Sequence, residues 1–466
     1  MLSRIIMKII NFYTAIIMKG LKCFLLVMLS AMAVSCNEYE YEAPRVPAPD
    51  KAIAVKPLEY EPLTRSQAEV ADKQGKFGIE FFKAYAKYES DNILLSPFLM
   101  FGNLCAVSVG MGGEDYKNLV SMLGFEDEIL ASKDTEITEL YDRFDNSLAD
   151  YFTTICEDIL SLDESTRLTY CSALGFTTSS LLESYRNKLK SYYGINVLEG
   201  GEYEMKTWIG DMVGQPYDRA NGKIGGILDG YFGIPANSIM NVLTFDARWS
   251  NYNKAETRVF NGSDGISYDR EYLTGHGSPV LDRQNHRPTC IKVYRSQDPA
   301  EPSALWLPYG NGAFSLVVML PREGQAIGDF IQGLSYEDYK LWNQKSCTYG
   351  EEFTYHIPTI DINYIAHADP CTHALDDMGL NYGEDCNFER AVEGNAQASV
   401  FSFGQGAGIK VTEGGTVAVA YSGQSLVKDD SPGTSPDPVE FIADRPFVYA
   451  IVDVHGTILF IGTVTK

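Results

Sequence analysis

The chain has 466 residues, of which 45% are hydrophobic and 21% are charged, a balance typical of a globular protein with a large core. Its formal net charge of −24 at pH 7 argues against nucleic acid or an anionic membrane surface as the main partner. The sequence contains no Gly-x-Ser-x-Gly, His-Glu-x-x-His or Walker motif, so we expect a protein that is not an enzyme.

The N-terminus has the pattern of a secretion signal that ends in a lipidation motif. Residues 18–22 are basic, and residues 23–33 form an apolar stretch that is too short to span a membrane. The sequence Ala33-Val-Ser-Cys36 then resembles a lipobox, in which a small residue precedes a lipidated cysteine. This pattern predicts a signal peptide over 1–36 and a lipid anchor on Cys36. The alternative is a signal that is cleaved elsewhere, with Cys36 unmodified.

Residues 37–65 predict a flexible tether between the anchor and the body of the protein. They begin with Asn-Glu-Tyr-Glu-Tyr-Glu, contain several prolines and show no apolar periodicity. An acidic stretch after the lipidated cysteine resembles signals that send some Gram-negative lipoproteins to the outer face. We therefore expect an outer-membrane lipoprotein in the cell envelope of a Gram-negative bacterium, exposed at the surface.

The rest of the chain, over 66–466, predicts one domain, because no linker or fixed-period repeat divides it. Apolar residues at helical spacing predict a first helix over 66–87. A second helix is expected after Ser96-Pro97, since serine caps helices and proline suits their first turn.

Strand patterns dominate the second half of the sequence. Runs of β-branched and aromatic residues predict strands over 239–244, 304–307, 314–320, 447–454 and 457–464. His455-Gly456 separates the last two runs and predicts a tight hairpin. Early helices and late antiparallel strands together indicate an α+β fold.

The cysteines and histidines show no pattern of a disulfide framework or a metal site. Two of the nine cysteines, Cys23 and Cys36, belong to the signal and lipobox, which leaves seven in the body. Cys105 lies in an apolar run and is expected to be a small buried hydrophobe. A pairing of Cys371 with Cys386 stays open, because the two are close in sequence. The six histidines lack metal-ligand spacing.

Two kinds of residue alternate in the segment after residue 410. The sequence Lys410-Val-Thr-Glu-Gly-Gly-Thr-Val-Ala-Val-Ala-Tyr-Ser422 contains a charged hinge with two glycines, followed by small and β-branched residues. With a period of two, the small residues Thr416, Ala418, Ala420 and Ser422 fall on one face. Such a face suits a strand that must fit over a filled core. The polar, proline-rich stretch 429–438 that follows suits no packed element.

This segment resembles the reactive-centre loop of serpins, a family of protease inhibitors whose hinge reads Glu-Glu-Gly-Thr followed by alanines. Further stretches over roughly 70–466 resemble serpin motifs in the same order. They are Asp91-Asn-Ile-Leu-Leu-Ser-Pro-Phe98, Asn221-Gly-Lys-Ile224, Asn241-Val-Leu-Thr-Phe-Asp-Ala-Arg-Trp249, Leu307-Pro-Tyr-Gly310, Phe314-Ser-Leu-Val-Val-Met-Leu-Pro321, Ile357-Pro-Thr-Ile-Asp-Ile362, Ala374-Leu-Asp-Asp-Met-Gly-Leu380, Phe441-Ile-Ala-Asp-Arg-Pro-Phe447 and Ile458-Leu-Phe-Ile-Gly-Thr-Val464.

The resemblance implies a fold in which helices pack around a large mixed main sheet, with smaller antiparallel sheets and an exposed reactive-centre loop at about 413–440. It implies a monomeric suicide-substrate inhibitor of serine or cysteine endopeptidases, without cofactor or metal, that forms a covalent acyl complex with its target. The cut loop would insert into the main sheet. The expected hinge residues are Glu413, Gly415, Thr416, Ala418 and Ala420. The alternative is a non-inhibitory surface lipoprotein of the same fold that binds another molecule.

The resemblance implies that three residues help to control opening of the main sheet, and one of them departs from the family pattern. They are Ser96, Asn241 and Gln405, and serpins usually have a histidine at the position of Gln405. Serpins usually also have a polar residue where this chain has Leu99. Gln405 retains the ability to hydrogen-bond Asn241, although an amide and an imidazole differ in their donors and acceptors.

Family spacing implies that the protease cuts about fourteen residues after Gly415, at Asp429. One residue earlier, Lys428 would suit a trypsin-like pocket with a carboxylate at its base. We predict the bond Lys428–Asp429. The Leu426–Val427 region would suit elastase-like or papain-like enzymes, and Asp429 itself would suit Asp-directed ones. The expected target is a host or competitor protease of a gut or tissue surface.

Overall fold

The computed structural model describes residues 58–163, 166–176, 181–199, 237–249, 254–277, 290–295, 301–348, 353–366, 368–380, 386–394, 405–412, 415–416 and 439–466. These residues belong to one compact unit, Ala52–Lys466. The expected signal peptide and most of the expected tether lie outside them. Among the described residues, no helix combines the length and hydropathy needed to cross a membrane.

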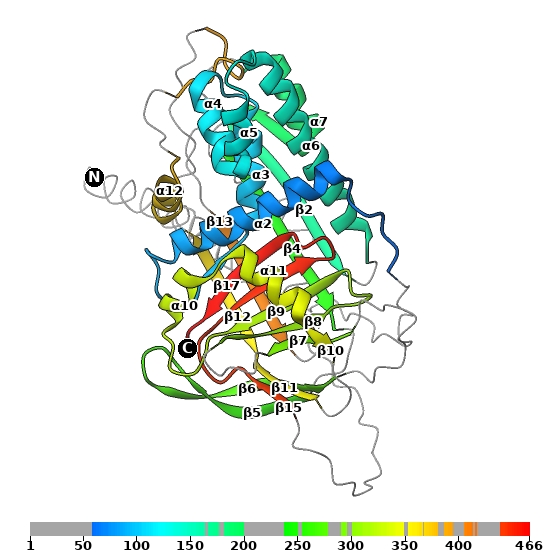
Figure 1. Cartoon of the computed structure of the whole chain (residues 1–466), viewed down its shortest axis with the longest axis vertical. Coiled ribbons are helices and arrows are strands. Elements are labelled where there is room, and N and C mark those ends of the chain that lie inside the picture. The colour runs from blue at the N-terminus through cyan, green and yellow to red at the C-terminus, as the bar shows by residue number, and fades with distance from the viewer. Residues whose placement is uncertain are drawn as a thin grey trace, which may run out of the picture. The chain divides into compact units, whose positions relative to one another are not determined.

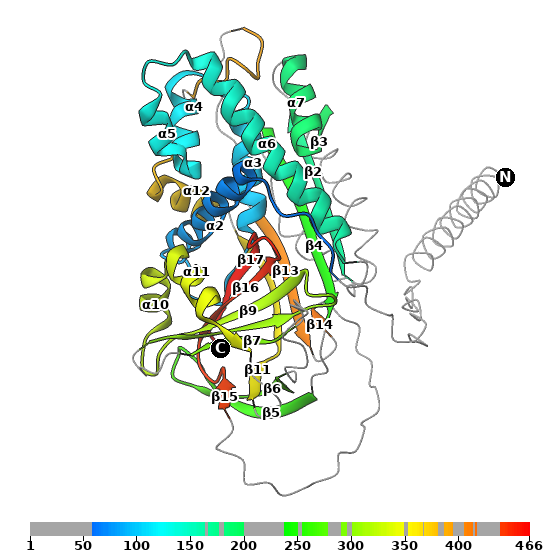
Figure 2. The same ribbon diagram turned by 45° about the vertical axis from the view of Figure 1, so that its right-hand side comes forward.

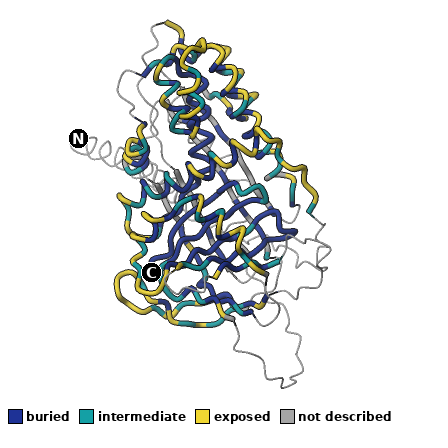
Figure 3. The backbone as a smooth tube through the Cα atoms, in the orientation of Figure 1, coloured by how far each residue is buried: buried dark blue, intermediate teal, exposed yellow. Residues whose placement is uncertain are grey.

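The first two helices lie where the sequence predicts them, and each begins at a capping residue. Helix α2, Arg65–Tyr85, starts with a capping box in which Thr64 and Gln67 bond each other's backbone N–H groups. Helix α3, Pro97–Ser108, follows the strand β1, Leu94–Leu95, and is capped by Ser96, which accepts from Leu99 N at 3.3 Å. All residues of α3 are buried, so its apolar sequence forms the centre of the core (Figure 3).

A group of helices lies together at one end of this unit, as Figures 1 and 2 show. These helices are α4 (Gly113–Val120), α5 (Glu126–Ala131), α6 (Ile137–Ser161) and α7 (Glu183–Tyr193), with a π-helical turn at Ser121–Phe125 between α4 and α5.

The sheet with the most described strands is antiparallel and has seven. Its order is β1, β17 (Ile458–Val464), β16 (Phe447–Asp453), β9 (Phe314–Leu320), β8 (Ser303–Pro308), β7 (Lys292–Arg295) and β10 (Cys347–Thr348). The predicted hairpin joins β16 to β17, and Gly456 in its turn has a φ of 88° that a residue with a side chain rarely adopts. Helices α10 (Ile327–Gly333) and α11 (Tyr336–Lys345) follow β9.

A four-stranded sheet lies at the end of the unit opposite α4 to α7 (Figure 1). Its order is β15 (Val439–Ile442), β11 (Phe353–Pro358), β6 (Ser267–His276) and β5 (Lys254–Asn261). Strand β15 is the first described element after the expected reactive-centre loop, and it runs parallel to β11. This parallel pair differs from the smaller antiparallel sheet that the sequence predicts.

The third sheet is mixed and corresponds to the expected main sheet. Its order is β12 (Ile360–Ala366), β13 (Gln405–Thr412), β14 (Gly415–Thr416), β4 (Asn237–Arg248), β2 (Arg167–Phe176) and β3 (Ile195–Glu199). Helix α12, Ala368–Asp377, follows β12. The α+β class is confirmed. The antiparallel sheet has one strand more than the mixed sheet. Two of its seven strands, β1 and β10, have only two residues each.

Cys105, Cys156, Cys290 and Cys347 form no disulfide bond. Cys105 is fully buried, and burial raises the pKa of its thiol well above the ordinary value, which confirms its expected place in the core. Cys371 and Cys386 are both buried and no disulfide joins them, so the pairing that the sequence left open does not form.

Candidate functional site

The two residues of β14 occupy a strand position between β13 and β4. On one side, Val411 pairs with Thr416 and Thr412 with Gly415. On the other side, Gly415 pairs with Arg248 and Thr416 with Ala247. Both pairings are antiparallel, so β13 and β4 run parallel to each other. Among the described residues, β13 and β4 each form backbone pairs with β14 but not with each other.

The expected hinge therefore lies where an additional strand begins. Strand β14 is found at the end of the mixed sheet nearer the four-stranded sheet (Figure 2). Towards the other end, ten residues of β4 and six of β13 pair with no described strand on the sides that face each other. The two strands also contact each other directly, so a strand that enters between them has to separate them. We call this region between β4 and β13 the open strand position.

Core side chains lie on one side of the open strand position. Ala247 and Val411, the two partners of Thr416, are both fully buried. Alternate residues further along β4 and β13, namely Phe245, Leu243 and Ile409, are buried as well. Directly paired residues in a sheet share one face, so position 416 lies on the face that points to the core.

The junction of β1 and α3 lies against the strands on both sides of the open strand position. Strand β1 contacts β12 and β13, and α3 contacts β4. Ser96, at this junction, is buried and donates its hydroxyl hydrogen to Leu459 O at 2.7 Å. Leu99 is also buried and belongs to the hydrophobic core. At position 99 an apolar side chain thus replaces the polar group that serpins usually have there.

The other two residues expected to control sheet opening lie on the two flanking strands. Asn241 in β4 pairs with Ser172 of β2, and Gln405 in β13 pairs with Ala366 of β12. Their role in opening remains a prediction. Glu413, Ala418, Ala420, Lys428, Asp429 and Cys36 lie outside the described residues.

A buried histidine lies on β11, beside the strand that follows the loop. His356 is 3% exposed and has Arg258 Nη2 3.2 Å from Nε2, with Thr274 Oγ1 and Glu256 Oε1 each 2.9 Å from Nδ1. The hydrogen bond from Arg258 lowers the pKa of Glu256 to about 2. Burial and the charge of Arg258 lower the pKa of His356 below its ordinary value. Sequence reasoning missed this cluster, since its members are up to a hundred residues apart and form no local motif.

No group of histidine, cysteine and carboxylate side chains suited to a metal ion is present among the described residues.

Known proteins resemble this chain over most of its length. Iripin-2 from Ixodes ricinus is 22% identical over 415 residues, which cover 86% of this chain and 94% of that protein. Human Serpin B9 is 21% identical over 406 residues, covering 84% and 98%.

Solved structures show the same fold. The native structure of the thermophilic serpin Tengpin has a TM-score of 0.67 at 18% identity and covers 88% of this chain and 97% of Tengpin. Human thyroxine-binding globulin has a TM-score of 0.67 at 17% identity, covering 86% and 99%. The family model described as serpin (serine protease inhibitor) matches residues 72–466. With that match over most of its length, the chain belongs to the serpin family.

Proposed function

We propose that this protein is a suicide-substrate inhibitor of serine or cysteine endopeptidases. The target enzyme cuts the chain between β14 and β15, and the cut segment then enters the open strand position while the enzyme is still attached. The observation that carries the proposal is β14 itself, which already pairs with both β13 and β4.

The register of β14 supports the proposal, because its continuation would place small residues over the core. In the same register, Ala418 would lie opposite Phe245 and Ile409, and Ala420 opposite Leu243, all three of which are buried. Ser422 would lie opposite Asn241 and Gln405, the two polar residues expected to control sheet opening. A strand with large side chains at these positions would overfill the core, at about 1–3 kcal/mol for each.

The length of β4 supports the predicted position of the cut. Strand β4 starts at Asn237, which in this register would pair with residue 426. Residues after 426 would leave the sheet at the end where α7 begins. A reactive bond at Lys428–Asp429 would allow the whole inserted strand to pair with β4, with the attached enzyme outside the sheet.

The chemistry of the trap requires only the first half of the protease reaction. The catalytic oxygen or sulfur of the target attacks the carbonyl carbon of Lys428, and the peptide bond to Asp429 breaks. The new amino group of Asp429 departs with a proton, and Lys428 remains as an acyl ester or thioester. Inhibition results if insertion distorts the enzyme before water hydrolyses this bond.

The N-terminal segment completes the proposal. A lipid on Cys36 and a tether over 37–65 would hold a monomeric inhibitor on the outer membrane of a Gram-negative bacterium. The protein would there meet proteases from outside the cell. Supporting features are the lipobox pattern and the acidic tether of the sequence.

The second candidate is a non-inhibitory serpin that binds another molecule. Buried Leu99 favours it, because serpins usually have a polar group at that position, and so does Gln405, where serpins usually have a histidine. Thyroxine-binding globulin has a similar fold and, by its name, binds thyroxine.

Incubation with trypsin-like, elastase-like and papain-like proteases separates the two candidates. An inhibitor forms an SDS-resistant complex larger than either component, and denaturing this complex releases a C-terminal fragment that begins at Asp429. Cleaved protein without any complex would favour the binding protein. A complex whose fragment begins at another residue would support inhibition but refute the predicted bond.

A further inference from the structure

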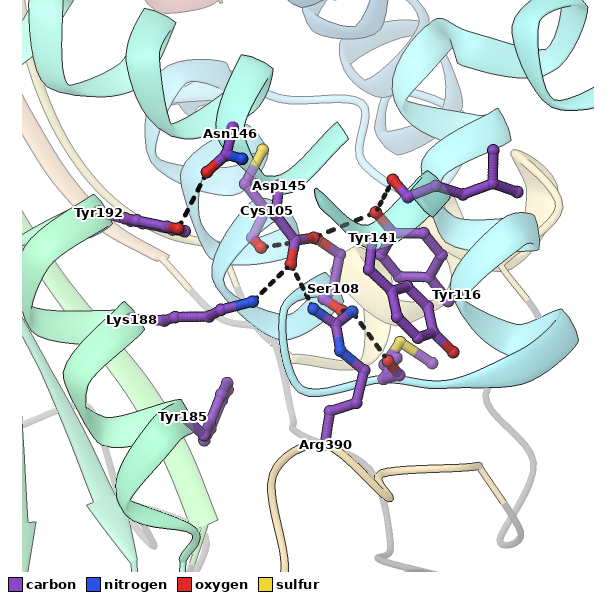
Figure 4. Close-up of polar contacts among 12 residues, drawn as sticks. Cys105, Ser108, Tyr116, Tyr141, Asp145, Asn146, Tyr185, Lys188, Tyr192 and Arg390 are labelled. Atoms are coloured by element: carbon purple, nitrogen blue, oxygen red, sulfur yellow. Dashed lines mark hydrogen bonds and ion pairs between the residues drawn. The ribbon is translucent and has the colours of Figure 1, made fainter. Parts of the chain in front are cut away.

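A buried carboxylate at the end of the unit away from β14 binds two cations from different elements (Figure 4). Asp145 in α6 is 1% exposed. Lys188 of α7 donates to its Oδ2 at 3.0 Å, and Arg390 donates to the same oxygen. The Tyr116 hydroxyl of α4 donates to Oδ1 at 3.1 Å. Water and salt screen the attraction between such charges less in a buried place than at an exposed one.

Besides its ion pair with Asp145, Arg390 makes contacts with an aromatic ring and with backbone carbonyl groups. Its guanidinium carbon lies 3.8 Å from the centre of the Tyr141 ring, and its Nη1 donates to Met111 O at 3.2 Å and Ser108 O at 3.5 Å. The planar guanidinium thus stacks on an aromatic ring and also binds the backbone after α3.

The backbone around Arg390 is bound to the same helices. Gly112 N donates to Asn387 O at 2.9 Å, and Arg390 N donates to Gly110 O at 3.2 Å. Leu182 N, just before α7, donates to Ala391 O at 2.8 Å, and Leu181 forms an antiparallel bridge with Val392.

These contacts join the two sides of the open strand position. Helix α7 ends at Gly194, whose φ of 63° turns the chain directly into β3, on the side of β2 and β4. Segment 386–394 lies between α12 and β13 in the chain, on the side of β12 and β13. Asp145 lies in α6, which contacts both α7 and β2, so Asp145 is on the side of β2 and β4 and Lys188 holds it to α7. The bonds of Arg390 to Asp145 and of Leu182 to Ala391 therefore cross from one side to the other.

We propose that Asp145, Lys188 and Arg390 form a clasp that holds the two sides of the mixed sheet together and slows entry of a new strand. This inference rests on the proposed loop insertion. A strand between β4 and β13 must move these sides apart, and the clasp opposes that movement at the end where the inserted strand would arrive last.

The substitution Lys188→Met tests the clasp with little risk to folding, because Lys188 is 31% exposed and Asp145 keeps its bond to Arg390. The matched control is Lys117→Met, which removes a lysine that pairs with Glu114 on its own helix at 2.7 Å. Both variants lose one positive charge in the same region, but only the first loses a bond to Asp145, the residue that Arg390 of the other side binds.

The first measurement is hydrogen exchange of the uncut protein, which needs no loop insertion. We expect the amides of Leu182 and Arg390 to exchange about tenfold faster in Lys188→Met than in the wild type, and unchanged in Lys117→Met. Equal exchange in all three proteins would overturn the clasp, whatever the loop does.

The second measurement is the rate at which protein with a cut loop becomes heat-stable. The clasp predicts that Lys188→Met converts about tenfold faster than the wild type and Lys117→Met. If Lys188→Met exchanged its amide hydrogens faster but became heat-stable at the wild-type rate, the contacts would be local and would not restrain the sheet. This result would refute the clasp. Wild-type protein that never becomes heat-stable would contradict the proposed function, while hydrogen exchange would still decide whether the contacts join the two sides.

Discussion

At the scale of single residues, the cluster around His356 makes folding stability depend on acid pH. A carboxyl group whose pKa is lower in the folded protein stabilises the fold above its unfolded value and loses this effect as the pH falls. For Glu256 the loss spans the range from its ordinary pKa of 4.5 to about 2. The lowered pKa of His356 adds a loss of stability below pH 6.5, since the unfolded state binds the proton more readily.

The substitution Glu256→Gln should therefore flatten the fall in unfolding free energy between pH 4.5 and pH 2. The cost at pH 7 should be about 1 kcal/mol, because the side chain is partly exposed and water screens the charges. Urea unfolding at a series of pH values measures both effects. Glu114→Gln is the control, and an equal change of slope in that exposed variant would contradict the role of the His356 cluster.

Gly462 is a residue where the backbone leaves no room for a side chain. A Cβ atom there would lie 2.2 Å from Ile93 O and 2.6 Å from the Tyr449 hydroxyl. Gly462→Ala should lower the free energy of unfolding by about 2–3 kcal/mol, because β1 would have to move away from β17. The control is Gly328→Ala in α10, where a Cβ meets no atom within 4 Å and alanine should stabilise the helix by about 0.5–1 kcal/mol. Similar losses in both variants would refute this explanation.

At the scale of elements, the register of β14 predicts opposite outcomes for neighbouring residues of the loop. Ala420→Asp would place a charge on the core face of the inserted strand and should abolish the gain of stability after cutting, because a buried unpaired charge is costly. Val419→Asp would place the same charge on the other face and should keep most of that gain. Melting curves of both cut variants measure the difference. Equal behaviour would show that the inserted strand does not continue the register of β14.

At the scale of the whole molecule, the open strand position predicts that the intact protein is not in its most stable state. A cut within 424–432 should raise the melting temperature by roughly tens of degrees, because a new strand would pair on both edges and cover the core face with small residues. Thr416→Arg should prevent this rise, since the charge would lie beside buried Ala247 and Val411. Calorimetry before and after one confirmed cut tests the prediction, and an unchanged melting curve would exclude insertion.

The sequence by itself determined the features that depend on neighbouring residues. The cap at Ser96 starts α3, and Gly456 makes the turn between β16 and β17, both where local patterns predict them. Helical spacing over 66–87 likewise predicts α2, Arg65–Tyr85. The alternation after Gly415 and the order of the family motifs pointed to an inserting loop and to the serpin family. These signals can be read directly because helix caps, turns and period-two faces involve residues only a few positions apart.

Only the tertiary structure decided which distant segments meet. It placed Gly415 and Thr416 between β13 and β4 and so fixed a register that the loop sequence alone does not contain. It also brought together Asp145, Lys188 and Arg390, which are separated by up to 245 residues. Strand pairing and buried charge pairs of this kind result from the packing of the whole chain, because backbone groups and charges must find partners wherever folding buries them.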